Sequence, residues 1–159
     1  MSIFATAGAK LFIGTALASK ATDFVAADFT SQAWVQINNC ENIGSFGDTA
    51  EEIKFNDIGK GRTQKLKGTR DAGSMAIVCG IDYADPGQIA LLAAEKSIHD
   101  YAFKVEFNDA PEGGTPSQRM FVAKVMSAAE ALDEANNVMK LNSSLGINSN
   151  IVRVNAAEA

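Results

Sequence analysis

The sequence contains few side chains that could carry out catalysis. His99 is the only histidine, and it lies between Ile98 and Asp100, where a predicted helix gives way to a predicted strand. Little else in the chain would complete a Ser-His-Asp arrangement around it. We therefore interpret His99 as a surface or packing residue.

Cys40 and Cys79 are the only cysteines, and they do not form a Cys-x-x-Cys pair. With a single histidine the chain lacks the ligands for a zinc site, so we predict no metal and no cofactor. Free cysteines prefer buried positions, which favours two structural thiols. The alternative is a disulfide between subunits.

The glycines and acidic pairs do not indicate a phosphate-binding loop or an acid–base pair. Four glycines lack the strand-then-helix context of such loops and are predicted to form turns: Gly44, Gly47, Gly59 and Gly61. In a strand, adjacent carboxylates such as Glu51 and Glu52 point to opposite faces and could not share a substrate proton. The sequence therefore predicts a protein that is not an enzyme.

The composition indicates one folded domain, residues 1–159. The chain has 159 residues, of which 47% are hydrophobic and 21% charged, which is typical of a globular domain. Its 19 acidic and 14 basic residues give a net charge of −5, which argues against a surface that grips phosphates. If the protein meets DNA, it is expected not to hold it.

The N-terminal region resembles a secretory signal in part. Lys10 precedes the apolar run Leu11–Ile13, and Ala16–Ala18 resembles a cleavage site. Gly14 and Thr15 interrupt the run, however, which disfavours a signal. Charged residues on both sides leave no stretch of about twenty apolar residues, so we predict no membrane helix.

Period-two alternation of apolar and polar residues is the dominant pattern. It is clearest in Phe103–Phe107, which we predict to be a half-buried strand. In the run 75–83, the residues that would point to either face of a strand are apolar, which suggests a strand covered on both faces. Weaker alternation predicts further strands at 34–37, 51–55, 120–126, 138–141 and 147–154. Several short strands predict a mainly β fold, an antiparallel β-sandwich or barrel.

One flanking α-helix is predicted at about 86–97. Asp85 can cap it and Pro86 suits its first turn. Three apolar residues are expected on its packed face: Ile89, Leu92 and Ala93. At 127–134, a capping-box spacing and frequent alanine favour a second helix by local propensity.

A long polar loop is predicted at about 56–73. It carries five basic residues: Lys60, Arg62, Lys65, Lys67 and Arg70. These could contact phosphate, but acidic or amide groups on a neighbouring subunit would serve equally well. No aromatic residues are interleaved for base stacking, so nucleic-acid binding is the weaker interpretation.

The order of these features resembles the tail tube (major tail) proteins of long-tailed bacteriophages. The segments that carry the resemblance lie between Leu11 and Val154: Trp34–Ile37, Ile43–Gly47, Lys67–Gly73, Asp85–Gln88, Tyr101–Val105 and Phe121–Val125. The resemblance implies a structural virion protein that stacks as hexameric rings into a channel for DNA ejection. Similar subunits occur in contractile tails and secretion machines. A small β-barrel that binds an apolar ligand is the competing class, with a pocket lined by Phe103, Val105, Phe107 and Phe121.

The family also implies partners and positions. Expected partners are further copies of the chain, a tape measure protein, terminator and tip proteins, and double-stranded DNA that passes without specific binding, in a tail assembled in the host cytoplasm. Glu52 and Lys54 share one strand face, which we predict to face the lumen. The basic loop residues are predicted to contact the next ring, and residues 1–28 and 155–159 to be assembly arms. At 127–134 the family pattern favours a strand, and we adopt it because β context often overrides local propensity.

Overall fold

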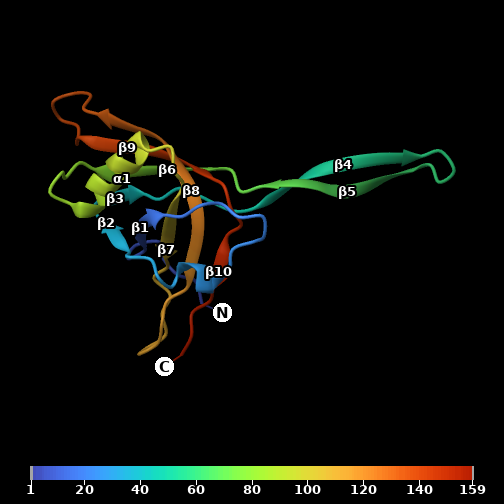
Figure 1. The fold of residues 1–159 in the computed structure, drawn as a ribbon, viewed down its shortest axis with the longest axis horizontal. Helices are drawn as coiled ribbons and strands as arrows, with labels where there is room; N and C mark the ends of the chain where they lie inside the picture. The colour runs from blue at the N-terminus through green and yellow to red at the C-terminus, as the bar shows by residue number, and fades with distance from the viewer. Residues whose placement is uncertain (1, 159) are drawn as a thin grey trace.

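The computed structural model describes residues 2–158, which form a β-rich body and one long hairpin that extends from it (Figure 1). The body contains strands β1 (Lys10–Ala16), β2 (Val35–Ile37), β3 (Cys40–Asn42), β6 (Ser74–Gly80), β7 (Tyr101–Glu106), β8 (Gln118–Ala131), β9 (Lys140–Ile147) and β10 (Val152–Val154), with helix α1 (Pro86–Lys96) and the short 3-10 helix η1 (Ala26–Phe29). Strands β4 (Thr49–Asp57) and β5 (Arg62–Asp71) form the hairpin. No helix among residues 2–158 is long and apolar enough to cross a membrane.

The body is built on an antiparallel sheet with the strand order β2-β1-β7-β8-β9-β6-β3. Strand β8 is 14 residues long and pairs with three other strands of this sheet, β7, β9 and β10. Its first half pairs with β7 and β10, and from Ala123 to Ala131 it pairs with β9, with a register shift between Val125 and Ser127. The predicted antiparallel, mainly β fold is confirmed. The strand that the family pattern favoured at 127–134 is confirmed up to Ala131.

Alternation along the strands produces a core on each side of the sheet. In β7, Phe103 and Val105 point to the side that α1 covers, whereas Ala102 points to the side covered by η1 and β10. The rings of Phe103 and Phe121 stack with centroids 5.9 Å apart. The predicted strand at 103–107 is therefore confirmed, and its apolar residues fill the interior.

The structure adds one strand that the sequence analysis did not predict and corrects another. The run Leu11–Ile13 forms β1, whose Leu11 and Ile13 are fully buried beside β7. Alternation did not predict this strand, because Leu11–Ile13 is apolar throughout. In β6 only one face is covered, since Met75, Ile77 and Cys79 are buried while Ser74 and Ala76 are exposed. The apolar run 75–83 was a poor indicator because Ala76 has only a methyl group, so leaving it in water costs little free energy.

Helix α1 begins as predicted, but it packs with a different face. The Asp85 carboxylate accepts a hydrogen bond from the Gln88 backbone N–H at 3.2 Å and also binds Asn38 beyond the end of β2. The buried residues are Gly87, Gln88, Leu91 and Ala94, whereas Ile89 and Ala93 are exposed and Leu92 is half-buried. The predicted face of Ile89, Leu92 and Ala93 is therefore wrong.

The buried polar residue Gln88 explains the error. Its side-chain amide donates to the Gly80 carbonyl at 2.8 Å and to the Asn38 carbonyl at 3.2 Å, and its oxygen accepts from the Asp82 N–H at 3.0 Å. A buried glutamine with its hydrogen-bonding groups satisfied is compatible with a core position. Apolar periodicity cannot detect such a residue, because it counts glutamine as polar.

The close approach of α1 to β2 yields a testable prediction at Gly87. A Cβ there would overlap the Gln36 carbonyl oxygen and lie 2.6 Å from the Ile37 Cα, and backbone cannot move aside cheaply. We expect Gly87→Ala to lower the free energy of unfolding by about 2–3 kcal/mol in urea titrations. Gly47→Ala, where an added Cβ meets nothing within 4 Å, is the matched control and should leave the midpoint nearly unchanged.

Candidate functional site

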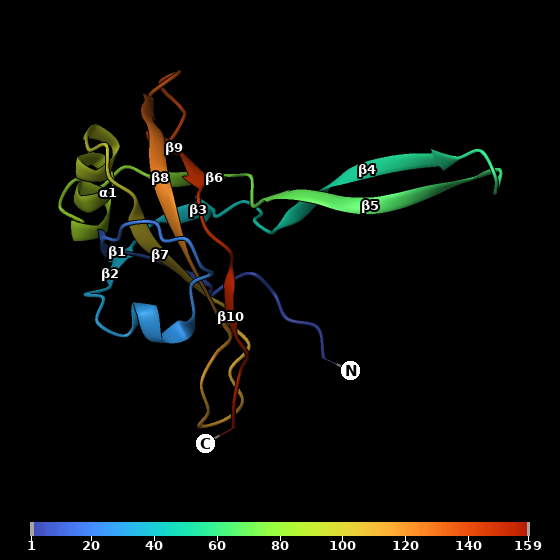
Figure 2. The ribbon, with the colours of Figure 1, turned by 45° about the vertical axis from the view of Figure 1, so that its right-hand side comes forward.

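The hairpin β4–β5 is the most distinctive surface feature of the molecule. Its two strands pair only with each other, and both views show it standing well clear of the body (Figures 1 and 2). The predicted polar loop at 56–73 is therefore wrong, because only residues 58–61 form a turn and Arg62–Asp71 is a strand. Strand β5 is exposed on both faces, so it lacks the apolar alternation that burial imposes on one face.

The turn at the tip is held by local hydrogen bonds. The Asp57 side chain accepts from the Gly59 N–H at 2.9 Å, and the Asp57 carbonyl accepts from the Gly61 N–H at 3.1 Å. Gly61 adopts a φ of 58°, a conformation that glycine tolerates without strain. The predicted turn at Gly59 and Gly61 is correct.

Two contacts close the base of the hairpin, and a third ties it to the body. Arg70 Nε lies 2.8 Å from an Asp48 carboxylate oxygen, and the Thr49 hydroxyl donates to the Asp71 carbonyl at 2.9 Å. The Gly73 carbonyl accepts from the Ile147 N–H at 3.0 Å at the end of β9. The hairpin is thus joined to the body at its base, while its two strands pair only with each other.

One face of the hairpin is apolar. Ile53 lies opposite Leu66 in the register, and Phe55 follows two residues later on the same face. Their exposed fractions are 48% for Ile53, 58% for Phe55 and 61% for Leu66. We call these three residues the apolar hairpin face. Large apolar side chains gathered on an exposed surface indicate an interaction site.

The opposite face is basic. Glu52 pairs with Lys67 and Lys54 with Lys65, and Glu52 Oε1 lies 3.2 Å from Lys65 Nζ. This face, which we call the basic hairpin face, carries three lysines against one glutamate. Glu52 and Lys54 share a face as predicted, but the charge around them is positive. The net negative charge of the chain is therefore not reflected in the immediate surroundings of Glu52.

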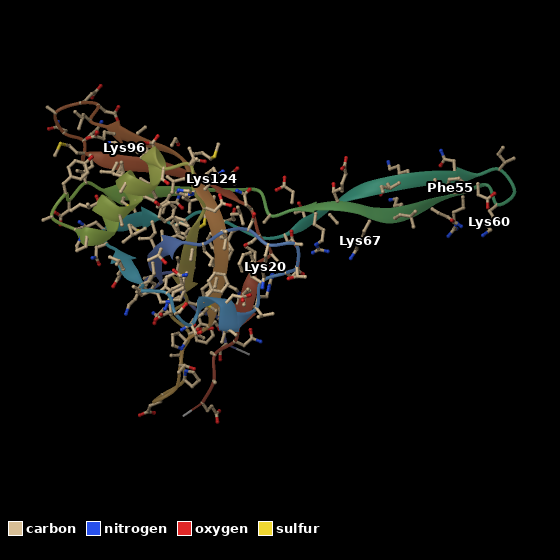
Figure 3. The ribbon with its side chains drawn as sticks, viewed as in Figure 1. Lys20, Phe55, Lys60, Lys67, Lys96 and Lys124 are labelled. Carbon is tan, nitrogen blue, oxygen red and sulfur yellow. The ribbon has the colours of Figure 1, made fainter. Side chains whose placement is uncertain are left out.

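The five predicted contact residues lie along the hairpin rather than in a loop. Lys60 is in the turn at the tip, and Lys67 lies nearer the body (Figure 3). Lys65 and Lys67 belong to the basic hairpin face, while Arg62 pairs with Asp57 beyond Phe55. Arg70 is at the base, where it binds Asp48. The strand pairing therefore places these five residues on both faces of the hairpin and at both its tip and its base.

The structure also places the other residues that the sequence singled out. Within residues 2–158, no three His, Cys, Asp or Glu side chains converge as metal ligands. His99 is exposed in the connection from α1 to β7, as predicted. Phe103 and Phe121, predicted as pocket residues, are fully buried against each other, and only Val105 and Phe107 reach a surface hollow of about 260 Å³.

Comparisons with known proteins give structural likenesses only. No family model matches the sequence, and no curated protein matches it. The chain superimposes on a solved structure described as the sheath/tube terminator of an extracellular contractile injection system, PVC, with a TM-score of 0.69, 9% identity, and coverage of 97% of this chain and 98% of that chain. It also superimposes on a chain of the anti-feeding prophage baseplate, with a TM-score of 0.68, 14% identity and 98% coverage of both chains.

A third likeness is to the SPP1 tail tube, with a TM-score of 0.59, 13% identity, and coverage of 94% of this chain and 78% of that chain. The chain therefore has the fold of tail tube proteins of phages and contractile injection systems. The resemblance inferred from the order of sequence features is confirmed at the level of fold. These neighbours are described as parts of tubes, sheaths and baseplates.

Proposed function

We propose that this protein is a structural tube subunit that assembles with copies of itself into stacked hexameric rings around a channel. In a phage tail the channel would pass double-stranded DNA into the host without binding it specifically. The tube would contact a tape measure protein along its lumen and terminator or tip proteins at its ends. The observation that carries this proposal is the projecting hairpin with its exposed apolar face, on a tail tube fold.

The hairpin supports assembly on energetic grounds. Each of Ile53, Phe55 and Leu66 leaves about half of its side chain in water, and covering that area would stabilise a contact by about 1 kcal/mol per side chain. A second copy of the chain is the occupant that we propose. Because a hairpin on one copy meets a different surface on the next, the contact is heterologous and generates rings or open polymers.

A tube subunit of a contractile machine is the second candidate. It is favoured by the near-complete mutual coverage of the chain and the two contractile-system structures, with TM-scores of 0.69 and 0.68. The same hairpin contact would serve in either machine. The terminal segments predicted as arms fit both, although residues 10–16 lie within the sheet and Ala157 pairs with Thr115 of the same chain.

Sedimentation velocity of the full chain over a range of concentrations tests the proposal. A tube subunit should form large species whose amount rises with protein concentration, because assembly obeys mass action. A small ligand-binding barrel should remain a monomer or dimer throughout. Monomers at every concentration would count against a tube subunit of either kind.

The predicted lumenal position of Glu52 has its own test. Glu52→Lys would remove the ion pair with Lys65 and place four lysines on the basic hairpin face. If that face lines the channel, the variant tubes should assemble but retain DNA at low salt, with the defect easing as salt shortens the screening length below about 8 Å. DNA ejection rates at two ionic strengths measure this effect.

Glu51→Lys is the matched control for this experiment. It makes the same change of charge one residue away, on the opposite hairpin face, where Thr69 contacts Glu51. Equal DNA retention by both variants, or by neither, would show that the Glu52 face does not line the channel.

A further inference from the structure

The two cysteines lie directly opposite each other on neighbouring strands. Cys40 of β3 pairs with Cys79 of β6, their sulfur atoms are 3.3 Å apart, and both are free thiols. The Gly80 N–H donates to the Asn39 carbonyl at 2.9 Å, which places the cysteines in a narrow pair without hydrogen bonds between them. Such pairs bring Cα atoms to about 4.5 Å, within the range that a disulfide bridges.

The position of this pair gives it structural importance. The chain leaves the sheet after β3, forms the whole β4–β5 hairpin and returns as β6. Cys40 and Cys79 therefore flank the segment that contains the hairpin. Strand β3 is only three residues long and has a single partner in the sheet, so it is the weaker of the two attachments.

We propose that Cys40 and Cys79 are a dithiol site that closes to an intrachain disulfide by exchange with a small-molecule disulfide such as oxidised glutathione, and that this bond fixes β3 to β6 and closes the stretch of chain that contains the hairpin. Cys79 is fully buried and already faces the Cys40 sulfur, so the partner of Cys40 lies within the same chain. This differs from the disulfide between subunits that the sequence left open. The proposal stands whether or not the protein forms tubes.

The environment assigns each cysteine a role in the exchange. Cys40 is half-buried, and a hydrogen bond from the Cys79 thiol lowers the pKa of Cys40 and favours its thiolate. The same bond, together with burial, raises the pKa of Cys79. Since the thiolate is the attacking species, Cys40 reacts first with the external disulfide.

The exchange has two steps, in which the bonds, electrons and protons balance. The Cys40 thiolate attacks one sulfur of oxidised glutathione, the glutathione S–S bond breaks, and one glutathione leaves as a thiolate while Cys40 holds the other. Cys79 then loses its proton to solvent, attacks the Cys40 sulfur and displaces the second glutathione thiolate. The protons released by the two cysteines end on the two glutathione molecules, so two protein thiols are oxidised and one glutathione disulfide is reduced.

Intact mass and thiol counting on the full-length protein test this inference. After incubation with oxidised glutathione, the folded chain should lose two hydrogen atoms, contain no free thiol and carry no glutathione. A peptide containing Cys40 should be found linked to one containing Cys79. At equal protein concentration, the oxidised chain should melt about 5–15 °C above the reduced chain, because a cross-link constrains the unfolded state.

Two single variants serve as controls. Cys79→Ala should accumulate one glutathione on Cys40, and Cys40→Ala should remain unmodified because Cys79 is buried. Neither variant should gain thermal stability on oxidation. Persistent free thiols, a stable glutathione adduct on the natural chain, disulfide-linked dimers, or an oxidised melting temperature no higher than the reduced one would each overturn the proposal.

Discussion

The double variant Phe55→Asp, Leu66→Asp should fold normally and fail to assemble. Both side chains lie on the apolar hairpin face with more than half of their surface exposed, so the monomer loses little packing. In the assembly, two carboxylates would enter a contact that we propose to be apolar. We expect a loss of about 2–4 kcal/mol per contact, which weakens association by about 30- to 1,000-fold. Sedimentation velocity measures the loss, and circular dichroism verifies the fold.

The matched control adds the same charges to the other side of the hairpin. Asn56 and Thr63 pair one position further along the strands, on the face opposite Phe55, and both are exposed. Asn56→Asp, Thr63→Asp should assemble with at most a small change. Equal defects in the two double variants would mean that charge on the hairpin, rather than its apolar face, controls assembly.

The second large effect is expected at Leu91. This side chain is fully buried between α1 and the sheet, so Leu91→Asp would place a carboxylate in the core with no partner prepared for it. We expect a cost of about 4 kcal/mol or more, a large part of the 5–15 kcal/mol that stabilises a typical domain. Urea unfolding followed by circular dichroism should show a strongly lowered midpoint or no folded protein.

Ile89→Asp on the same helix separates burial from helix propensity. Ile89 is 51% exposed, so the same substitution there should lower stability far less. If Leu91→Asp and Ile89→Asp were equally stable, the packing of α1 in this structure would be wrong.

The elements that could be predicted from the sequence are those whose local pattern reflects burial on one side. Strand β7 alternates because Phe103 and Val105 enter one core while Lys104 and Glu106 do not. The start of α1 was predictable because Asp85 and Pro86 act within the first turn. The strand at 127–131 needed the family pattern, since its alanines favour a helix locally.

The errors arose where burial does not produce an apolar pattern. Strand β5 is exposed on both faces, so its ten residues resembled a polar loop. Gln88 and Gly87 occupy the packed face of α1, although neither residue type suggests it. For α1 the missing information was the position of β2 and Asn38, far away in the sequence. For β5 it was that the hairpin leaves both of its faces exposed.

The candidate site was located only in part. The basic residues of the hairpin were identified, but their division between faces follows from a register with a shift between Ala50 and Glu52, which the sequence does not reveal. Alternation placed Glu52 and Lys54 together on one face, whereas the contact of Leu66 with the face of Ile53 and Phe55 follows only from strand pairing. The opposition of Cys40 and Cys79 likewise depends on β3 meeting β6.

Electron microscopy of the purified full-length protein tests the central claim most directly. Our account predicts hollow rings with six-fold symmetry that stack into tubes, in which Ile53, Phe55 and Leu66 of each copy are covered by a neighbouring copy. Particles that remain monomeric at high concentration, or assemblies in which the hairpin stays exposed to solvent, would contradict it.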